Sequence, residues 1–293
     1  MDYHISKPDA TMQRIADTIG YRRGDRRLLF SLRDLADLTA FPYRRHVPRL
    51  DVCHRILDVL NDLAMVDVRF GCPADPSDRN DYDIVFAADG PHSRWREAAC
   101  IGFPGQPYDG QVARLVCVPT AFDGWPAVTY VFTDDDSVSV LQLADSTRVI
   151  LRVGPQEPPL AELLERAMDA LGFLPDVADW STYRAQRALC DTNLRGTCVI
   201  VGDAAHQTNT RGGMNMNAGM HDAAVLARTF ATDPDELPVA AAERLRVATE
   251  ELLPRTHATL GPGRFDDVAT IHADPVRRRQ FLVEASMLDM VRW

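Results

Sequence analysis

The alternation of apolar and polar residues predicts an antiparallel sheet in the middle of the chain. Four runs place apolar or β-branched residues at every second position, which is typical of half-buried strands. They span residues 112–118, 128–132, 138–143 and 148–153. The polar cluster at 133–137 separates two of these runs, as a turn between antiparallel strands does.

Apolar residues at helical spacing predict helices before and after these strands in the sequence. Three helices are expected over 49–64, 160–173 and 238–258, and a more polar helix is expected over 8–19. Repeats and low-complexity tracts are absent from the sequence. The pattern therefore indicates a mixed α/β protein.

Shorter apolar runs predict the remaining strands. Residues 66–70 alternate like a short strand, whereas 82–88 and 197–201 are nearly continuous apolar runs, typical of strands that are buried on both faces. Each of the two continuous runs leads into a pair of glycine and aspartate, at 89–90 and at 202–203. Such a pair alone is more often an ordinary turn than a binding site.

The second pair belongs to a longer strand, loop and helix pattern. A glycine turn, Gly212-Gly213, follows the strand at 197–201, and helical spacing continues over 216–227. This arrangement directs free backbone N–H groups and the positive end of a helix towards an anionic or electron-accepting ligand. Asp203, at the carboxyl end of the strand, is placed to accept hydrogen bonds from ligand hydroxyl groups.

Residues 197–227 resemble the second flavin-binding motif of the FAD-dependent aromatic hydroxylases, the single-component flavoprotein monooxygenases related to p-hydroxybenzoate hydroxylase. In that family a GDAAH start, a Gly-Gly turn and an MN-x-G-x-x-DA helix bind the ribityl chain and flank the isoalloxazine ring. The positions that carry the resemblance are Gly202, Asp203, Ala204, Ala205, His206, Gly212, Gly213, Met216, Asn217, Gly219, Asp222 and Ala223.

A second motif agrees with this resemblance. Residues 88–96 are similar to the family's ADG-x-x-S-x-x-R motif, which contacts the FAD pyrophosphate region and is tied to NAD(P)H binding. Asp89, Gly90, Ser93 and Arg96 carry this match. Arg49, at the head of its helix, matches a family Gln or Arg that reaches FAD. Its side chain is expected to point into the crevice that Asp89 and Asp203 line.

The resemblance implies FAD as cofactor and NAD(P)H as a possible reductant. The residues expected to contact the cofactor are Arg49, Asp89, Gly90, Arg96, Gly202, Asp203, Ala204, His206, Gly212, Gly213, Asn215, Met216 and Asn217. Because pocket residues vary freely in this family, no catalytic residue is assigned. Asp89 and Asp203 are expected at the carboxyl ends of their strands, lining one crevice.

The sequence departs from the family pattern at its start and in the glycine loop. The GxGxxG turn that holds the FAD pyrophosphate in relatives is absent, since the one Gly-x-Gly is Gly261-Pro262-Gly263. Asn209-Thr210 replaces a Pro-Pro pair and Asn215 replaces a glycine. Arg211 adds a charge that either pairs with an anionic substrate or is solvated.

The missing unit leaves a gap in the expected sheet, since the absent strand is hydrogen-bonded on both sides in relatives. Three arrangements would remove this gap: the remaining strands close up, residues 1–20 cover the opening, or a second polypeptide fills it. We expect one of the first two arrangements in preference to a partner polypeptide.

Composition narrows the possible partners, the cellular compartment and the possible metal sites. The net charge of −10 argues against nucleic acid or an anionic membrane as partner, and residues 1–20 lack the apolar run of a signal peptide. The six cysteines lack CxxC spacing and most lie in apolar runs, so we expect reduced core thiols in a cytoplasmic protein. The eight histidines form no ligand cluster, so no metal site is expected.

The fold class expected is α/β, a truncated Rossmann-like FAD-binding domain with an inserted antiparallel-sheet substrate domain. The FAD-type domain would comprise 1–110 and 190–240, the substrate-type sheet 111–189, and a C-terminal helical segment 241–293. The function expected is hydroxylation or oxidation of an aromatic or polyketide-like small molecule with NAD(P)H and O₂. The alternatives are a flavin-free, non-redox enzyme or binding protein, or a subunit that needs a flavoprotein partner; a homodimer is a further possibility.

Overall fold

The computed structural model describes residues 13–134, 137–258 and 265–290, which group into two compact units. We call the first the sheet unit; it contains described residues up to 72, 110–183 and 265–283. We call the second the motif unit; it contains 73–109, 184–258 and 284–290. No helix in these described ranges is both long and apolar enough to cross a lipid bilayer.

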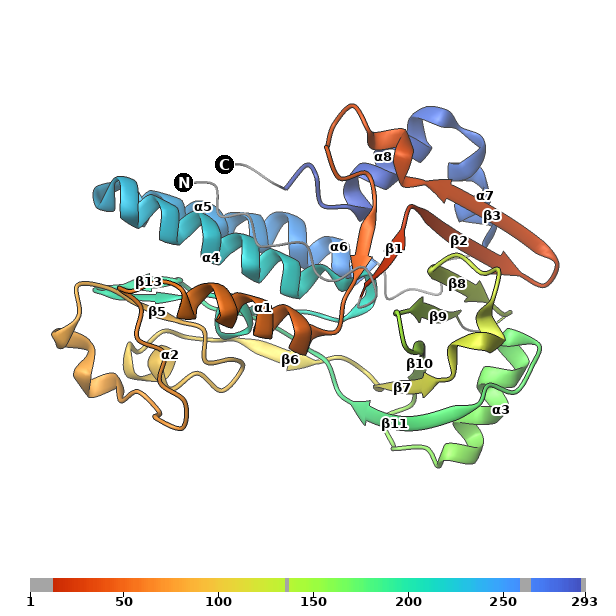
Figure 1. The fold of residues 1–293 in the computed structure, drawn as a ribbon, viewed down its shortest axis with the longest axis horizontal. Helices are drawn as coiled ribbons and strands as arrows, with labels where there is room; N and C mark the ends of the chain where they lie inside the picture. The colour runs from red at the N-terminus through yellow and green to blue at the C-terminus, as the bar shows by residue number, and fades with distance from the viewer. Residues whose placement is uncertain (1–12, 135–136, 259–264, 291–293) are drawn as a thin grey trace. The chain divides into compact units, whose positions relative to one another are not determined.

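A seven-stranded sheet dominates the sheet unit (Figure 1). Its strands, in spatial order, are β11 (Val177–Tyr183), β7 (Gln111–Cys117), β10 (Thr147–Val153), β9 (Ser137–Gln142), β8 (Val128–Phe132), β2 (Thr18–Arg23) and β3 (Arg26–Ser31). All neighbours run antiparallel except β2 and β8, which are parallel. The four strands predicted from alternation are confirmed.

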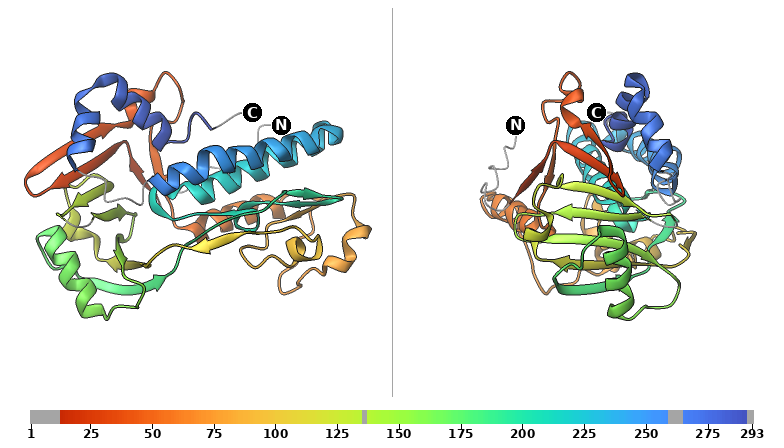
Figure 2. Two further views of the ribbon diagram at one scale, coloured as in Figure 1. Left: turned by 180° about the vertical axis from the view of Figure 1, so that it is seen from behind. Right: turned by 90° about the vertical axis from the view of Figure 1, so that its right-hand side faces the viewer.

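Helix α3 (Leu160–Leu171) packs its apolar stripe against one face of this sheet (Figure 2). Alternate strand residues, among them Leu115 and Leu151, point into this core and meet Leu163 and Ala167. Because side chains alternate across a strand, the residues between them lie on the opposite face. Arg114 on β7 and Arg148 on β10 lie on that face.

The predicted polar helix over 8–19 is wrong where the structure describes it, because residues 14–16 form β1 (Arg14–Ala16) and 18–23 form β2; positions 8–12 lie outside the described residues. Tyr21 explains the difference, since its ring lies 5.2 Å from those of both Phe30 and Tyr130 on neighbouring strands. Such cross-strand aromatic pairs override the weak local preference for helix.

The other N-terminal elements follow the sequence in part. Strand β4 (Arg44–His46) pairs with β1, and helix α1 (Arg49–Asn61) begins where expected but buries none of its side chains. The short strand predicted at 66–70 is wrong: these residues are exposed and irregular, without a neighbouring strand to complete their backbone hydrogen bonds. Helices α7 (Phe265–Ala273) and α8 (Pro275–Ala285) complete the unit.

The motif unit contains two small sheets and most of the remaining helices. One sheet has the order β13 (Leu194–Arg195), β14 (Cys198–Ile200) and β5 (Val85–Ala87); the other has β15 (His206–Gln207), β12 (Gln186–Leu189) and β6 (Gly105–Pro107). The helices are α2 (Arg94–Ala98), α4 (Met214–Thr232), α5 (Leu237–Val247) and α6 (Leu253–Ala258). Helices α4 and α5 lie side by side (Figure 1).

Short helical turns connect these elements. They are η2 (Leu32–Leu35), η3 (Pro76–Asp81), η4 (Pro119–Phe122), η5 (Gly202–Ala204), η6 (Arg211–Gly213), η7 (Pro234–Glu236) and the π-helical η8 (Ala248–Leu252). The predicted helix over 238–258 is therefore present as α5, η8 and α6 in succession.

The two units do not follow the predicted domain boundaries. Residues 14–72 group with the sheet rather than with the two motifs, because β2 forms a parallel pair with β8 inside the seven-stranded sheet. The strands that precede the two motifs, β5 and β14, do share one sheet, as predicted. The functional assignment of each segment stays a prediction.

The expected gap in that sheet is open in the described structure. Strand β5 is the last strand of its sheet, and among the described residues no strand pairs with its outer edge. Residues 14–16 and 18–20 lie in β1 and β2, so they do not cover this edge as strands either; positions 1–12 lie outside the described residues.

The cysteines divide into two classes, so the expectation that most are core thiols is only half right. Cys117, Cys190 and Cys198 are buried, whereas Cys53, Cys72 and Cys100 are exposed, and all six are free thiols. Burial, assisted by the nearby Asp176 and Asp191 carboxylates respectively, raises the pKa of Cys117 to about 11 and of Cys190 to about 12.

Brief alkylation with iodoacetamide at pH 8 should therefore modify Cys53, Cys72 and Cys100 first, because the buried thiols are inaccessible and protonated. Peptide mass spectrometry would measure the label at each site, and the same reaction in guanidinium chloride should label all six. Labelling of Cys190 at the rate of Cys53 in the native protein would contradict the described core.

Candidate cofactor-binding site

The two sequence motifs leave their sheet at the same edge. Strands β14 and β5 run parallel with Ile200 opposite Ala87, and the N–H of Val201 donates to the Ala87 carbonyl at 3.0 Å. Asp203 and Asp89 follow these strand ends and are both exposed. This places both carboxylates beyond the carboxyl edge of the sheet, where ligands bind in open α/β sheets; that they line one crevice stays a prediction.

The first motif is organised by its own side chains. Asp89 accepts hydrogen bonds from the N–H groups of Arg94, at 2.9 Å, and Trp95, at 3.4 Å. Ser93 is the N-cap of α2, its hydroxyl oxygen accepting from the Arg96 N–H at 3.0 Å. Asp89 and Ser93 thus satisfy backbone donors that the start of a helix leaves free.

Arg96 connects the first motif to the second. Its side chain is buried, and it donates to the carbonyl oxygens of Ala204 at 2.8 Å and Pro91 at 2.9 Å. The guanidinium carbon also lies 3.8 Å from the ring centre of Phe103, a cation–π contact. Since both terminal nitrogens bind the protein itself, Arg96 acts here by fixing the two loops to each other.

Behind the second motif, a chain of hydrogen-bonded polar side chains runs from the buried core to the exposed Asp203. Asp222 accepts from Arg244 Nε at 2.6 Å and lies 2.9 Å from His206 Nε2. The other ring nitrogen, Nδ1, lies 3.0 Å from Asn215 Oδ1, and Asn215 Nδ2 donates to Asp203 at 2.8 Å. We call Asp203, Asn215, His206, Asp222 and Arg244 the polar relay.

The polar relay runs without interruption from the sheet edge to the helix pair. A carboxylate only accepts hydrogen bonds, so Asp203 requires the NH₂ group of Asn215 to face it. The Asn215 oxygen then faces His206 Nδ1, and the Asp222 carboxylate faces Nε2. The exposed Asp203 is thereby connected to the buried Asp222 and Arg244.

The glycine turn presents the start of α4 to solvent. Gly212 and Gly213 have φ angles of 84° and 67°, in the left-handed region that favours glycine. Gly213 is the N-cap of α4 and offers no side-chain hydrogen bond to the first turn of the helix. The positive end of this 19-residue helix is therefore not neutralised by a capping side chain.

Close packing joins α4 to the Gly-Asp loop. A Cβ atom built on Gly219 would lie 2.9 Å from the Cα of Gly202, so only glycine fits without movement of the backbone. Met216 and Asn217 are exposed, and Asn217 donates to the Gly213 carbonyl at 2.7 Å. Ala204 and His206 are buried below the loop.

The departures from the family pattern have structural roles. Asn209 is fully buried; its amide donates to the Thr256 carbonyl of α6, and its oxygen accepts from the Arg211 N–H at 2.9 Å. Asn215, in place of a family glycine, is the middle member of the polar relay. Both asparagines thus hold the loop against neighbouring elements.

Two sequence features lie apart from these loops. Arg49 is the exposed first residue of α1 in the sheet unit, and its contact with the cofactor stays a prediction. Gly261-Pro262-Gly263 lies outside the described residues. The ligand contacts expected of the motif residues likewise stay predictions.

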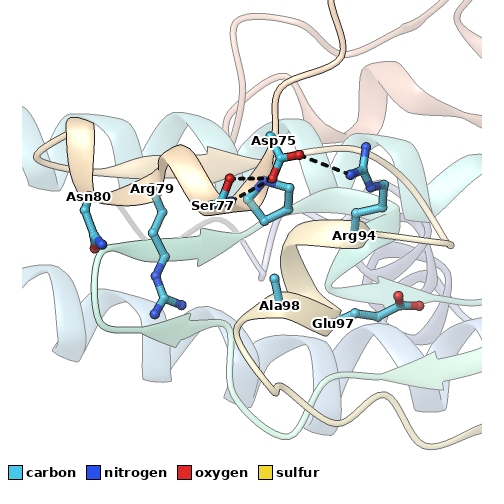
Figure 3. Close-up of a pocket in the computed structure, with 8 residues that line it drawn as sticks. Asp75, Ser77, Arg79, Asn80, Arg94, Glu97 and Ala98 are labelled. Atoms are coloured by element: carbon cyan, nitrogen blue, oxygen red, sulfur yellow. Dashed lines mark hydrogen bonds and ion pairs between the residues drawn. The ribbon is translucent and has the colours of Figure 1, made fainter.

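A polar pocket of about 560 Å³ adjoins the first motif (Figure 3). It lies between η3 and α2 and is lined by Asp75, Pro76, Ser77, Arg79, Asn80, Arg94, Glu97 and Ala98. Asp75 binds the Ser77 hydroxyl at 2.8 Å and lies 3.8 Å from Arg94 (Figure 3). Because acidic and basic groups alternate around it, the pocket favours no single ligand charge.

Sequence reasoning identified the members of the polar relay without their connections. His206 and Asp222 were matched as motif positions and Arg244 as part of the predicted C-terminal helix. The available signal was Asp222, the one acidic residue of α4, since a buried charge requires a partner. Arg244 shares α5 with Glu243 and Arg246, so nothing in the sequence distinguished it.

Comparison with known proteins identifies the family. Residues 79–259, more than half of the chain, match the family described as FAD binding domain. The chain belongs to this family. It is 33% identical over 193 residues to pentachlorophenol 4-monooxygenase of Sphingobium chlorophenolicum. This alignment covers 59% of this chain and 35% of that protein. It is 28% identical over 204 residues to para-nitrophenol 4-monooxygenase of Pseudomonas sp. (strain WBC-3). That alignment covers 65% of this chain and 50% of the relative.

The chain spans half or less of the length of these two relatives. Among solved structures, a p-nitrophenol 4-monooxygenase from Pseudomonas putida DLL-E4 aligns with a TM-score of 0.78 at 21% identity, covering 96% of this chain and 83% of that one. The flavin-dependent monooxygenase PieE, solved with FAD and substrate, aligns with a TM-score of 0.67 at 14% identity. The alignment covers 96% of this chain and 60% of the PieE chain. The predicted fold class and the resemblance to FAD-dependent aromatic hydroxylases are confirmed.

Replacing Asp222 by Asn should destabilise the protein by about 3–5 kcal/mol, because Arg244 and His206 would remain buried without their carboxylate. Urea unfolding followed by circular dichroism would measure this change. The matched control is Glu250→Gln, which removes an exposed carboxylate that pairs with Arg246 at i,i+4 and should change little. Equal effects of the two substitutions would contradict the polar relay.

Proposed function

We propose that this chain binds FAD and serves as a flavin-dependent monooxygenase that hydroxylates or oxidises an electron-rich aromatic or polyketide-like small molecule, with NAD(P)H as reductant and O₂ as oxygen source. One observation carries the proposal: the two flavin-type motifs emerge from one sheet edge and are fixed to each other by Arg96. The phenol monooxygenases similar to this chain support the aromatic substrate class.

The described residues fit an anionic, hydroxyl-rich cofactor at this edge. The uncapped start of α4 offers backbone N–H donors and positive potential to a flavin oxygen or a phosphate. Asp203 and Asp89 offer carboxylate acceptors for hydroxyl groups, and the left-handed glycines Gly212 and Gly213 leave the loop without Cβ atoms. Bound FAD would supply the redox chemistry, while the protein binds and orients it.

The buried side chains behind the motifs hold this arrangement in place. His206, through Asn215, fixes one oxygen of the exposed Asp203, which leaves the second oxygen available to a ligand hydroxyl. Arg96 fixes the Ala204 carbonyl from the opposite side. Positioning residues of this kind reduce the conformational freedom that binding would otherwise have to remove.

The open outer edge of β5 favours a second candidate, a subunit that takes a strand, glycine turn and helix from another polypeptide. The absent turn would contribute several hydrogen bonds to the pyrophosphate, each worth about 1.5–3 kcal/mol. A partner strand would satisfy the free backbone groups of β5 and bring such a turn to the same edge.

Titration with FAD, followed by quenching of flavin fluorescence, tests the proposal. The chain should bind FAD, and Asp203→Ala should weaken binding about tenfold, the loss of one charge-assisted hydrogen bond. The matched control is Asp235→Ala, which removes an exposed carboxylate from η7, away from the motifs.

Absence of FAD binding by the isolated chain would overturn its role as a stand-alone flavoprotein. Binding that returns on addition of a polypeptide carrying a GxGxxG unit would support the second candidate. Equal FAD affinities of the Asp203→Ala and Asp235→Ala variants would overturn the assignment of Asp203.

A further inference from the structure

The hairpin formed by β2 and β3 carries four arginines next to its turn (Figure 1). Strand pairing places Arg22 directly opposite Arg27, and Arg23 directly opposite Arg26. Because side chains alternate across a strand, the two pairs lie on opposite faces of the sheet. Like charges directly opposite each other are destabilising, so each pair requires groups that offset its repulsion.

Aspartates of the sheet unit offset the repulsion between Arg23 and Arg26. Asp266 of α7 lies 2.7 Å from Arg26 and 3.6 Å from Arg23. Asp134 lies 2.7 Å from Arg23. The Arg26 guanidinium carbon also lies 4.7 Å from the ring centre of Phe265. On this face of the hairpin the protein itself therefore supplies the counter-charges.

The pair formed by Arg22 and Arg27 has no such aspartates. Among the residues that the structure describes, neither side chain forms a hydrogen bond or an ion pair within 4 Å. Burial lowers the pKa of Arg22 and the charge of Arg27 lowers it further, while Asp25 in the turn opposes them. This face therefore keeps an excess of positive charge. We call Arg22 and Arg27 the arginine pair.

Trp125 holds one member of the arginine pair in place. The Arg22 guanidinium carbon lies 3.9 Å from the centre of the Trp125 ring, a cation–π contact. A guanidinium that contacts a ring through its flat face keeps its N–H donors for other partners. Trp125 packs against the core between the sheet and α3, and strand pairing places Arg22 beside Val131 of the same core. The arginine pair is therefore on the α3 side of the sheet, not on the face of Arg114 and Arg148.

Leu29 adds exposed apolar surface next to the arginine pair. It lies two residues after Arg27 on β3, hence on the same face, and is 56% exposed. Two cations without counter-charges thus lie between the indole of Trp125 and an exposed aliphatic side chain.

We propose that the arginine pair is a binding site for the phosphate group of a small molecule. A phosphate group carries about two negative charges near neutral pH and several acceptor oxygens, so one group neutralises both guanidinium groups at once. A carboxylate carries one charge and would leave the second arginine unbalanced. Each planar guanidinium can donate two parallel hydrogen bonds to phosphate oxygens. Leu29 and Trp125 provide apolar contacts for the organic part of a phosphate ester.

NMR chemical-shift titration at pH 7.5 and constant ionic strength tests the proposal with three probes: inorganic phosphate, glycerol 3-phosphate and acetate. Both phosphate probes should shift the signals of residues 22–27, and acetate should bind there at least about tenfold more weakly. Tighter binding of glycerol 3-phosphate than of inorganic phosphate would identify an ester as the source of the group. Equal affinities would identify free phosphate.

Substitutions separate recognition by the arginine pair from general attraction to a basic hairpin. Arg22→Gln and Arg27→Gln should each weaken phosphate binding about tenfold. The matched control is Arg26→Gln, which makes the same charge change on the opposite face of the same hairpin and should leave phosphate binding unchanged. Arg22→Lys should weaken binding less than Arg22→Gln, because it keeps the charge and loses the planar donor group.

The melting temperature of the ligand-free variants shows whether lost binding reflects lost folding. Arg27 is exposed and forms no ion pair in the described ranges, so Arg27→Gln should not lower the melting temperature. Equal loss of phosphate binding in Arg26→Gln and Arg27→Gln would overturn the proposal, as would acetate binding as tightly as phosphate. Absence of phosphate-induced shifts at residues 22–27 would also overturn it. These signals come from the sheet unit, so the outcome is independent of whether the motif unit binds FAD.

Discussion

Asp222 is the residue on which the geometry of the motif unit depends. Its carboxylate, on α4, accepts from Arg244 on α5 and from His206 at the start of β15. A charged group buried this deeply is tolerated only when its partners are themselves held in place. Consequently the helix pair, the Gly-Asp loop and, through Asn215, the exposed Asp203 form one connected network. The single buried carboxylate thereby links the helical core to an acceptor at the sheet edge.

The arginines of the two units differ in how many protein oxygens they meet. In the motif unit Arg96 and Arg244 each donate to protein oxygens, although the buried Nη1 atom of Arg244 has no hydrogen-bond partner among the described residues. In the sheet unit Arg114 and Arg148 lie side by side without such oxygens among the described residues.

The sequence predicted the elements whose pattern is local. Alternation located β7 to β10 to within one residue at each end, and motif spacing placed β5 and β14 in one sheet. It was wrong at 14–19, where β1 pairs with β4 and β2 pairs with β3 and β8, and at 66–70, where no partner strand exists in the described structure. The polar relay could not be derived, because Arg244 and Asp222 meet only when α4 packs against α5. Long-range contacts of this kind leave no periodicity in the sequence.

The shortness of β5 is consistent with its position at a sheet edge. It has three residues and pairs only with β14, so few backbone groups face outward. Edge strands are kept short in natural proteins because a long unpaired edge invites association with other chains. The motif that follows β5 is nevertheless ordered by its own side chains. Asp89 and Ser93 accept hydrogen bonds from backbone N–H groups of the loop and helix, and Arg96 donates to the Pro91 carbonyl. The edge of the sheet and the order of the first motif are therefore separable, because the hydrogen bonds that shape the loop come from its own residues and not from a further strand beside β5.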